Sequence, residues 1–216
     1  MGWSLFGGGS AAILEPDRIW RGRPEKLAAV CREASAAERV LVLAHFRSTL
    51  EALRAGLEEQ GKRVRVYADR IEGARLGAAA SLAVADGIAL ALAQALPAPA
   101  KPAKAEGEAL VLVAEHHFLP PEDERIRKFC EGLPLKARLR FHESLDSPLL
   151  ATFGSDRIGP LLEALKLPQG EAIEHAMIDR AIRGAQEKLA ARVAAPKSAE
   201  SPEQWAKLNL PGGAGA

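Results

Sequence analysis

The chain has 216 residues, of which 48% are hydrophobic, and its 29 basic and 28 acidic residues leave a formal net charge of +1. This near balance excludes the strongly basic surface of a nucleic-acid-binding protein and the polybasic segment of a membrane-surface protein. The length predicts one domain with additions, or at most two small ones.

The first residues, 1–15, are rich in glycine and are predicted to be a flexible segment or a short hook. They lack the basic and long apolar regions of a signal peptide. The most apolar stretch, 82–96, contains Asp86 and is shorter than the roughly 20 residues of a membrane span. Cys31 and Cys130 lie far apart and are expected to be reduced thiols. We therefore expect a cytoplasmic protein without stable membrane insertion.

The next segments alternate between helix and strand. A helix is predicted over 24–35, and VLVLAHF at 40–46 is typical of a strand covered on both faces. Ser48 and Glu51 have the spacing of a capping box at the start of a second helix, which Gly61 should end.

The alternation continues to about residue 145. Strands are predicted at 64–68, 88–93, 109–115 and 137–145, with helices at 73–84 and 121–131. The alanine-rich segment 88–93 is also compatible with a helix, and the alternating pattern of 137–145 places that strand near an edge. The Pro/Ala/Lys segment 95–108 indicates an insertion or a replaced functional loop. This order predicts an α/β fold with a mostly parallel sheet flanked by helices.

From Ser147 onward the pattern is helical only. A long amphipathic helix is predicted over 171–193, with an acidic start, a basic end and a stop at Pro196. Its apolar positions are Ile173, Met177, Ile178, Ile182, Ala185 and Leu189. A short helix is expected near 202–208. The predicted division is a flexible segment 1–15, an α/β domain 16–150, a helical extension packed on it at 151–195 and a Pro/Gly-rich tail at 196–216.

Motifs for catalysis are missing from the printed sequence. It contains no Walker A loop, no GxGxxG after a strand, no nucleophile elbow and no Cys/His pair with zinc-ligand spacing. His45, His116, His117 and His142 fall at predicted strand ends, where open α/β sheets bind ligands. With Glu115, they could form a metal or acid–base cluster, or they could simply be polar residues leaving a buried strand. We expect no catalytic residue, metal or cofactor.

The block 145–192 resembles the SecA preprotein translocase motor, at the junction of its second motor domain with the helical scaffold. The resemblance rests on FGSDRI at 153–158, IEH at 173–175 and the AIxxAQxK pattern from Ala181. The segments 17–27, 40–53 and 109–126 are also similar to parts of that second motor domain. The resemblance implies a RecA-like, helicase C-terminal-like fold.

The chain departs from this family where the family handles ATP. The family's second motor domain supplies arginines from a loop after its third strand and from a QxxGRxGR-type motif. Here the first is replaced by the Pro/Ala/Lys loop 95–108 and the second by 125–138, in which Arg125 and Arg127 remain without the glycine–arginine frame. The P-loop of the first motor domain is not found in these 216 residues. No ATP-binding residue is therefore carried over.

The residues that keep the family motif are predicted to be structural or to bind a partner. They are Phe153, Gly154, Ser155, Asp156, Arg157, Glu174, His175, Gln186, Lys188 and Arg192. Ser155 or Asp156 could cap a helix, His175 could cap or pair, and Gln186 and Lys188 could lie on a solvated face or on an interface.

The sequence favours a non-catalytic SecA-like module that binds a protein in export, with the SecA motor, the translocon or an export substrate as candidates. Three alternatives stay open. They are an unrelated small-molecule or protein-binding domain, an enzyme that uses His116, His117 and Glu115, and a module that binds nucleotide weakly.

Overall fold

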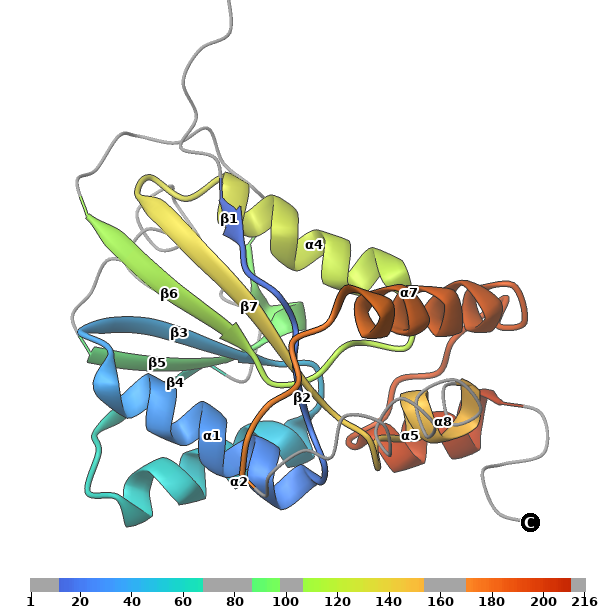
Figure 1. The fold of residues 1–216 in the computed structure, drawn as a ribbon, viewed down its shortest axis with the longest axis horizontal. Coiled ribbons are helices and arrows are strands. Elements are labelled where there is room, and N and C mark those ends of the chain that lie inside the picture. Colours follow the sequence, from blue (N-terminus) through green and yellow to red (C-terminus); the bar gives the residue numbers. More distant parts are fainter. Residues whose placement is uncertain (1–11, 68–86, 98–106, 154–169, 211–216) are drawn as a thin grey trace, which may run out of the picture.

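A seven-stranded sheet forms the centre of the molecule. The computed structural model describes residues 12–67, 87–97, 107–153 and 170–210. The strands are β1 (Ile13–Leu14), β2 (Arg18–Trp20), β3 (Arg39–Ala44), β4 (Val64–Tyr67), β5 (Gly87–Leu92), β6 (Glu108–Val113) and β7 (Lys136–Ser144). Their order is β1-β7-β6-β3-β5-β4, with β2 also paired to β7, and each pairing between these strands is parallel. The predicted α/β fold with a mostly parallel sheet is confirmed (Figure 1).

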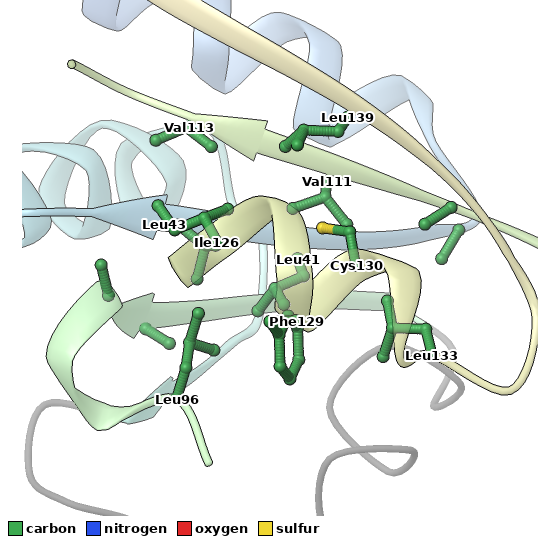
Figure 2. Packing of buried hydrophobic residues seen from close by; sticks show 14 of the residues in the cluster. Leu41, Leu43, Leu96, Val111, Val113, Ile126, Phe129, Cys130, Leu133 and Leu139 are labelled. Carbon is green, nitrogen blue, oxygen red and sulfur yellow. The ribbon is translucent and has the colours of Figure 1, made fainter. Parts of the chain in front are cut away.

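Helices cover both faces of this sheet. Helices α1 (Arg23–Ala36) and α2 (Arg47–Glu59) lie on one face, and α4 (Pro120–Glu131) lies on the other. Strand β3 serves both layers because successive side chains of a strand point to opposite faces. Leu41 and Leu43 pack in the α4 layer, whereas Val42 packs in the layer of α1 and α2. Figure 2 shows the α4 layer, with Ile126, Phe129 and Cys130 over β3 and β6.

The ambiguous segment 88–93 is a strand. Residues 88–91 of β5 pair with both β3 and β4, and the side chains of 88–92 are buried. A central position needs short apolar side chains on both faces, which explains why this strand is so rich in alanine. A short 3₁₀ helix, η1 (Ala93–Ala95), follows it. The expected helix 73–84 and most of the loop 95–108 lie outside the described residues.

The N-terminal segment covers the outer side of β7. Strand β1 pairs with Arg138–Leu139 and β2 pairs with His142–Ser144, so that β7 has neighbours on both sides. The prediction that β7 lies near an edge agrees with this, because only these short strands lie beyond it. Residues 13–14, at the end of the expected flexible segment, take part in the sheet.

The predicted capping box at Ser48 is wrong. Helix α2 begins at Arg47, with Phe46 as the N-cap two positions before Ser48 and with no side-chain cap hydrogen bond. The backbone N–H of Ser48, in the first turn, donates to the backbone carbonyl of Glu200. At the other end, Gly61 has φ of 71°, the left-handed conformation expected of a glycine that ends a helix.

The C-terminal helices form a third apolar cluster at the end of the sheet. They are α5 (Pro148–Phe153), α7 (Ala176–Ala190) and α8 (Pro202–Asn209). Helix α7 lies beside α4 and α5 and buries Ile178, Ile182, Ala185 and Leu189 (Figure 1). Trp205 of α8 is buried on Phe118, with ring centroids 4.2 Å apart. These four residues of the apolar stripe share their cluster with Ile19, Phe46 and Phe118.

The long helix is shorter than predicted. It begins at Ala176 rather than 171, because Ile173 is extended and exchanges two backbone hydrogen bonds with Ile19 of β2. Met177, which the periodicity assigned to the apolar face, is 54% exposed. Asp179, rather than Glu171 and Glu174, is the acidic residue of the first turn. The pairing with β2, a contact 154 positions away in the sequence, overrides the local helical pattern.

Both cysteines are free, as expected, and the structure shows that both are buried. Within the described residues, no helix is long and apolar enough to cross a membrane.

Candidate functional site

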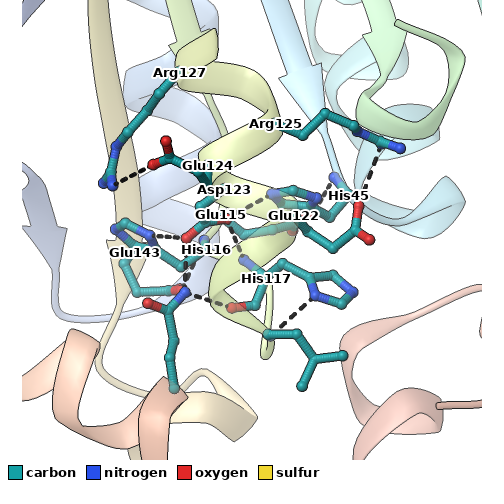
Figure 3. A network of polar contacts seen from close by, with 12 residues as sticks. His45, Glu115, His116, His117, Glu122, Asp123, Glu124, Arg125, Arg127 and Glu143 are labelled. Carbon is teal, nitrogen blue, oxygen red and sulfur yellow. Dashed lines mark hydrogen bonds and ion pairs between the residues drawn. The ribbon is translucent and has the colours of Figure 1, made fainter. Parts of the chain in front are cut away.

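The site where an open α/β sheet usually binds a ligand lies between β3 and β6. These strands are neighbours, but the helices that follow them, α2 and α4, lie on opposite faces of the sheet. Such a change of direction leaves a crevice at the carboxyl ends of the strands. His45 follows β3, and Glu115, His116 and His117 follow β6. Three of the four strand-end histidines therefore converge here, which the sequence left open (Figure 3).

The N-terminal end of α2, at this crevice, is occupied by the chain itself. The Glu115 carboxylate accepts hydrogen bonds from the backbone N–H of His45 at 2.9 Å and of Phe46 at 3.3 Å, and from Thr49 Oγ1 at 2.6 Å. The backbone carbonyl of Glu200 accepts from the N–H of Ser48 at 2.9 Å. A helix N-terminus attracts anions because its first N–H groups lack partners. Here the Glu115 carboxylate accepts from the two N–H groups just before the helix and from the Thr49 hydroxyl in its first turn, so the chain itself places a carboxylate at this end.

Asp123 is the centre of a buried polar network beside Glu115. Its Oδ1 accepts from His45 Nε2 and from the backbone N–H of His117, both at 2.9 Å. Its Oδ2 accepts from His116 Nδ1 and from Gln186 Nε2, both at 2.7 Å. Burial disfavours the charge of this carboxylate, but His116 and His45 hold its pKa well below the usual range. Four donors, from the segments that follow β3 and β6 and from α7, thus converge on one side chain.

His116 lies between two carboxylates. Its Nε2 is 3.1 Å from Asp17, opposite the bond to Asp123, and its ring stacks on Phe141 with centroids 4.5 Å apart. Burial opposes the charge, but the attraction and hydrogen bonds of Asp123 and Asp17 raise the pKa of His116 to about 10. At neutral pH this imidazole is a cation with both nitrogens engaged. It has no free lone pair for a metal ion or for general-base catalysis.

His117 and His142 differ from His116 in charge. Burial and the neighbouring His45 lower the pKa of His117 to about 3, and its Nδ1 accepts from the backbone N–H of Leu119. Burial, together with Arg18, Arg140 and Lys26, lowers the pKa of His142 well below its usual value. His142 is fully buried against Trp20, whose indole N–H donates to its Nδ1 at 3.1 Å. It therefore stands apart from the other three histidines.

The described residues include no group of three or more His, Cys, Asp or Glu side chains suited to hold a metal ion. The polar cluster at the crevice is instead an internally paired network of cations and carboxylates. Its geometry favours a structural role over the acid–base or metal chemistry that the histidines suggested.

The SecA-like motif residues are only partly within the described structure. Phe153 ends α5, whereas Gly154, Ser155, Asp156 and Arg157 lie outside the described residues. Glu174 accepts from Arg18 at 2.8 Å. His175 is the N-cap of α7, where its Nδ1 accepts from the backbone N–H of Met177. Lys188 and Arg192 are exposed.

Gln186 lies neither on a solvated face nor on an exposed interface, so both alternatives for it were wrong. It is 3% exposed, and its Nε2 donates to the carbonyl of His117 and to Asp123, both at 2.7 Å. The amide thereby anchors α7 to the crevice. The pattern that identified Gln186 gave no information about these partners, because they lie 63 and 69 positions away.

Arg125 and Arg127 lie on α4 and pair within that helix. Arg125 Nη2 is 3.3 Å from Glu122, and Arg127 Nη1 is 4.0 Å from Glu124. The guanidinium of Arg127 also lies 5.3 Å from the ring centroid of Phe141. The segment that stands in place of the family's glycine–arginine motif is therefore helical through residue 131.

The comparison with curated proteins identifies relatives among SecA subunits, although no protein-family model matches the chain. The protein translocase subunit SecA of Methylobacillus flagellatus is 53% identical over 88 residues, which are 41% of this chain and 10% of that protein. The SecA of Nitrosomonas eutropha is 53% identical over 53 residues, or 24% of this chain and 6% of that protein. The SecA of Dechloromonas aromatica is 35% identical over 88 residues, with the same coverage as the first.

Among solved structures, T4 UvsW has a TM-score of 0.42 and 11% identity, covering 78% of this chain and 32% of that chain. The C-terminal part of the Fun30 ATPase domain has a TM-score of 0.41 and 13% identity, covering 77% of this chain and 54% of that chain. These TM-scores are too low to support an inference about function. The chain spans about a tenth of the length of the first curated relative, and over that part it is related to SecA.

Proposed function

We propose that this chain is a non-catalytic, SecA-related module that acts in the cytoplasm by binding a protein of the export machinery, with the SecA motor as the first candidate. Its counterpart in SecA would be the second motor domain and the start of the helical scaffold. The similarity to SecA subunits supports the export context.

The observation that carries the non-catalytic part is the position of Glu115. Phosphates bound by α/β sheets lie at a helix N-terminus beside the switch in strand order. At that position in this chain, the Glu115 carboxylate takes three donors and the Glu200 carbonyl takes a fourth. A phosphate would have to displace the buried Glu115 carboxylate, and it would be repelled by that carboxylate if it stayed nearby.

The arginines support the same conclusion. An arginine assists phosphoryl transfer only when it is aimed at the charge that develops on the phosphate. Arg125 and Arg127 instead lie 3.3 and 4.0 Å from glutamates of their own helix. Among the motif residues, Lys188 and Arg192 are exposed, and we propose that they face the partner.

Two calorimetric titrations test the proposal. With ATP or ADP and Mg²⁺, we expect no binding heat up to millimolar nucleotide. With purified SecA from the same organism, we expect saturable binding that Lys188→Glu weakens at least threefold. Lys136→Glu is the matched control, because it reverses the charge of another exposed lysine, at the far end of β7.

Nucleotide binding or ATP hydrolysis by the purified chain would contradict the non-catalytic part. The absence of binding to SecA, to the translocon and to an export precursor would contradict the export part. Equal weakening by the two lysine variants would remove α7 from the interface.

A further inference from the structure

The outward face of helix α7 combines a glycine with several charged side chains. The helix lies at the periphery of the molecule and turns Ile178, Ile182 and Leu189 toward the third apolar cluster (Figure 1). Residues three, four and seven positions apart share one side of a helix. The outward face, on the side away from the cluster, consists of Met177, Arg180, Arg183, Gly184, Glu187 and Lys188.

Gly184 is the unexpected residue of this face. A glycine inside a helix is less favourable than an alanine, because it loses more conformational freedom on folding. It is expected where the backbone needs a positive φ or where another group leaves no room for a Cβ atom. In the described ranges, positive φ occurs at other glycines, namely Gly61, Gly87, Gly107 and Gly170. A Cβ atom placed on Gly184 meets no atom within 4 Å. Nothing in the described part of the chain therefore requires a glycine at this position.

Long side chains flank Gly184 along the helix. Residues four apart are neighbours on a helix surface, so Arg180 lies one turn before Gly184 and Lys188 lies one turn after it. Met177, two turns before Gly184, is 54% exposed. Methionine is a flexible side chain that adapts to the surface of a partner. The absent side chain thus leaves a gap between two cationic residues, with an exposed apolar residue at one end.

The outward face carries an excess of positive charge. Arg180, Arg183 and Lys188 are exposed, and Glu187 is the one acidic residue of the face. Asp179 lies closer to the interior, where burial and the charge of Asp17 raise its pKa, although Arg183 opposes this effect. Three cations and one carboxylate leave two positive charges in excess. A face of this kind is complementary to an acidic segment of a partner.

A helix is the element that fits such a gap. Two packed helices lie about 8–10 Å apart, depending on the side chains between them, and a glycine at the crossing permits the shorter distance. Carboxylates one turn to either side of the crossing on the partner helix can then pair with Arg180 and Lys188. A nucleic acid would gain from the cations but not from the gap, and its dense charge would lie beside Glu187.

We propose that the outward face of α7 binds an acidic helix of the protein partner, with the closest approach at Gly184. The inference rests on the proposed function for the existence of a protein partner. It adds which face of the chain makes the contact and which chemistry the partner presents there.

The first test fills the gap and measures binding to purified SecA by calorimetry. Gly184→Leu should bind at least tenfold more weakly than the native chain, and Gly184→Ala about threefold more weakly, because added volume disrupts a close contact. Ala28→Leu is the matched control, since Ala28 is an exposed small residue of another helix, α1. It should bind as the native chain does. Gly184→Ala should also raise the midpoint of thermal unfolding, because alanine favours the helix. Weaker binding by a more stable variant cannot come from a damaged fold.

The second test uses a defined probe, a synthetic helical peptide of Glu, Ala and Leu, titrated into the full chain and followed by NMR. We expect saturable shifts of the backbone amides of α7, which high salt reduces and Gly184→Leu abolishes. The same peptide with Lys in place of Glu, and an oligothymidylate, should leave these amides unchanged.

The outcomes separate this inference from the export proposal. If SecA binds the native chain and Gly184→Leu equally, the inference is overturned and the export proposal stands. If SecA does not bind the native chain, the export proposal loses its first candidate, and the peptide titration decides the inference. The absence of shifts in α7 with the acidic peptide, or equal shifts with the basic peptide or the oligothymidylate, would overturn the inference.

Discussion

Two charge clusters attach the N-terminal segment to the sheet, one that is buried and one that reaches the surface. In the buried cluster, Asp17 reaches His116, which pairs with Asp123, and all three side chains are at most 11% exposed. In the second cluster, which we call the exposed cluster because it reaches the surface at Arg138, Glu15 pairs with Arg138 and Arg140 of β7, and these side chains range from 11% exposed at Glu15 to 44% exposed at Arg138. Both clusters join the same short segment to neighbouring parts of the molecule, but they differ in how far water reaches them.

The exposed cluster extends beyond the segment. Arg140 also pairs with Glu33 of α1, Glu33 pairs with Arg18 of β2, and Arg18 pairs with Glu174 ahead of α7. Its ion pairs therefore connect five parts of the chain: the N-terminal segment, β7, α1, β2 and the segment ahead of α7. Such pairs gain little in water, because solvent and salt screen them and long side chains lose freedom. A buried charge that loses its partner cannot be hydrated, so the smaller cluster should have the larger energetic effect.

The largest expected effect is that of Asp123→Ala. The change leaves His116 with Asp17 alone and removes the acceptor of His45 and Gln186, so it should lower the free energy of unfolding by about 3–5 kcal/mol. Urea unfolding measures the change. Glu124→Ala, on the exposed face of the same helix, is the control and should cost less than about 1 kcal/mol. Similar losses for the two variants would mean that the network is not the main connection at the crevice.

A smaller effect should follow from lowering the pH. The folded pKa of His117, about 3, is below the value of about 6.5 expected in the unfolded chain. As the pH falls, His117 is therefore protonated in the unfolded state before it is protonated in the folded state. The free energy of unfolding decreases as the pH falls from 6.5 toward 3. Between pH 7 and pH 5, this group should account for about 1–2 kcal/mol.

His117→Gln removes that proton uptake and should be less sensitive to pH over this range, as measured by urea unfolding at each pH. The pH dependence of stability that comes from His116 has the opposite sign. Its raised pKa of about 10 gives stability that is complete below pH 6.5 and decreases as the pH rises through 10. An identical pH slope in His117→Gln and the native chain would show that His117 is protonated in the folded state.

The smallest effect should come from the exposed cluster. Arg138 is 44% exposed and pairs with Glu15 and Glu108. Arg138→Ala should cost no more than about 1 kcal/mol, and the loss should shrink in 1 M NaCl because salt screens exposed charges. Thermal unfolding at low and high salt tests this. A loss as large as that of Asp123→Ala, unaffected by salt, would reverse the comparison between the clusters.

Sequence patterns determined the elements wherever the local signal and the tertiary environment agreed. The continuous apolar run of β3, the helical spacing of α1 and the proline-initiated α4 follow directly from residue type and period. The predictions failed where a distant segment competed with the local pattern. Ser48 does not cap α2, because it lies within the first turn and its N–H donates to the carbonyl of Glu200. Residues 171–175 are not helical because Ile173 pairs with Ile19.

For the candidate site, the sequence determined that four residues come at the ends of strands, namely His45, Glu115, His116 and His117. In a parallel sheet, they therefore lie on the side where the carboxyl ends of the strands meet. Strand order was decided only by the tertiary structure, and it brought β3 next to β6. The partners Asp17, Asp123 and Gln186 come from three separate segments. Periodicity reports which face of an element is apolar, but not which polar groups meet in the interior. Their pairing depends on how the layers pack, because buried charges and donors must find partners across them.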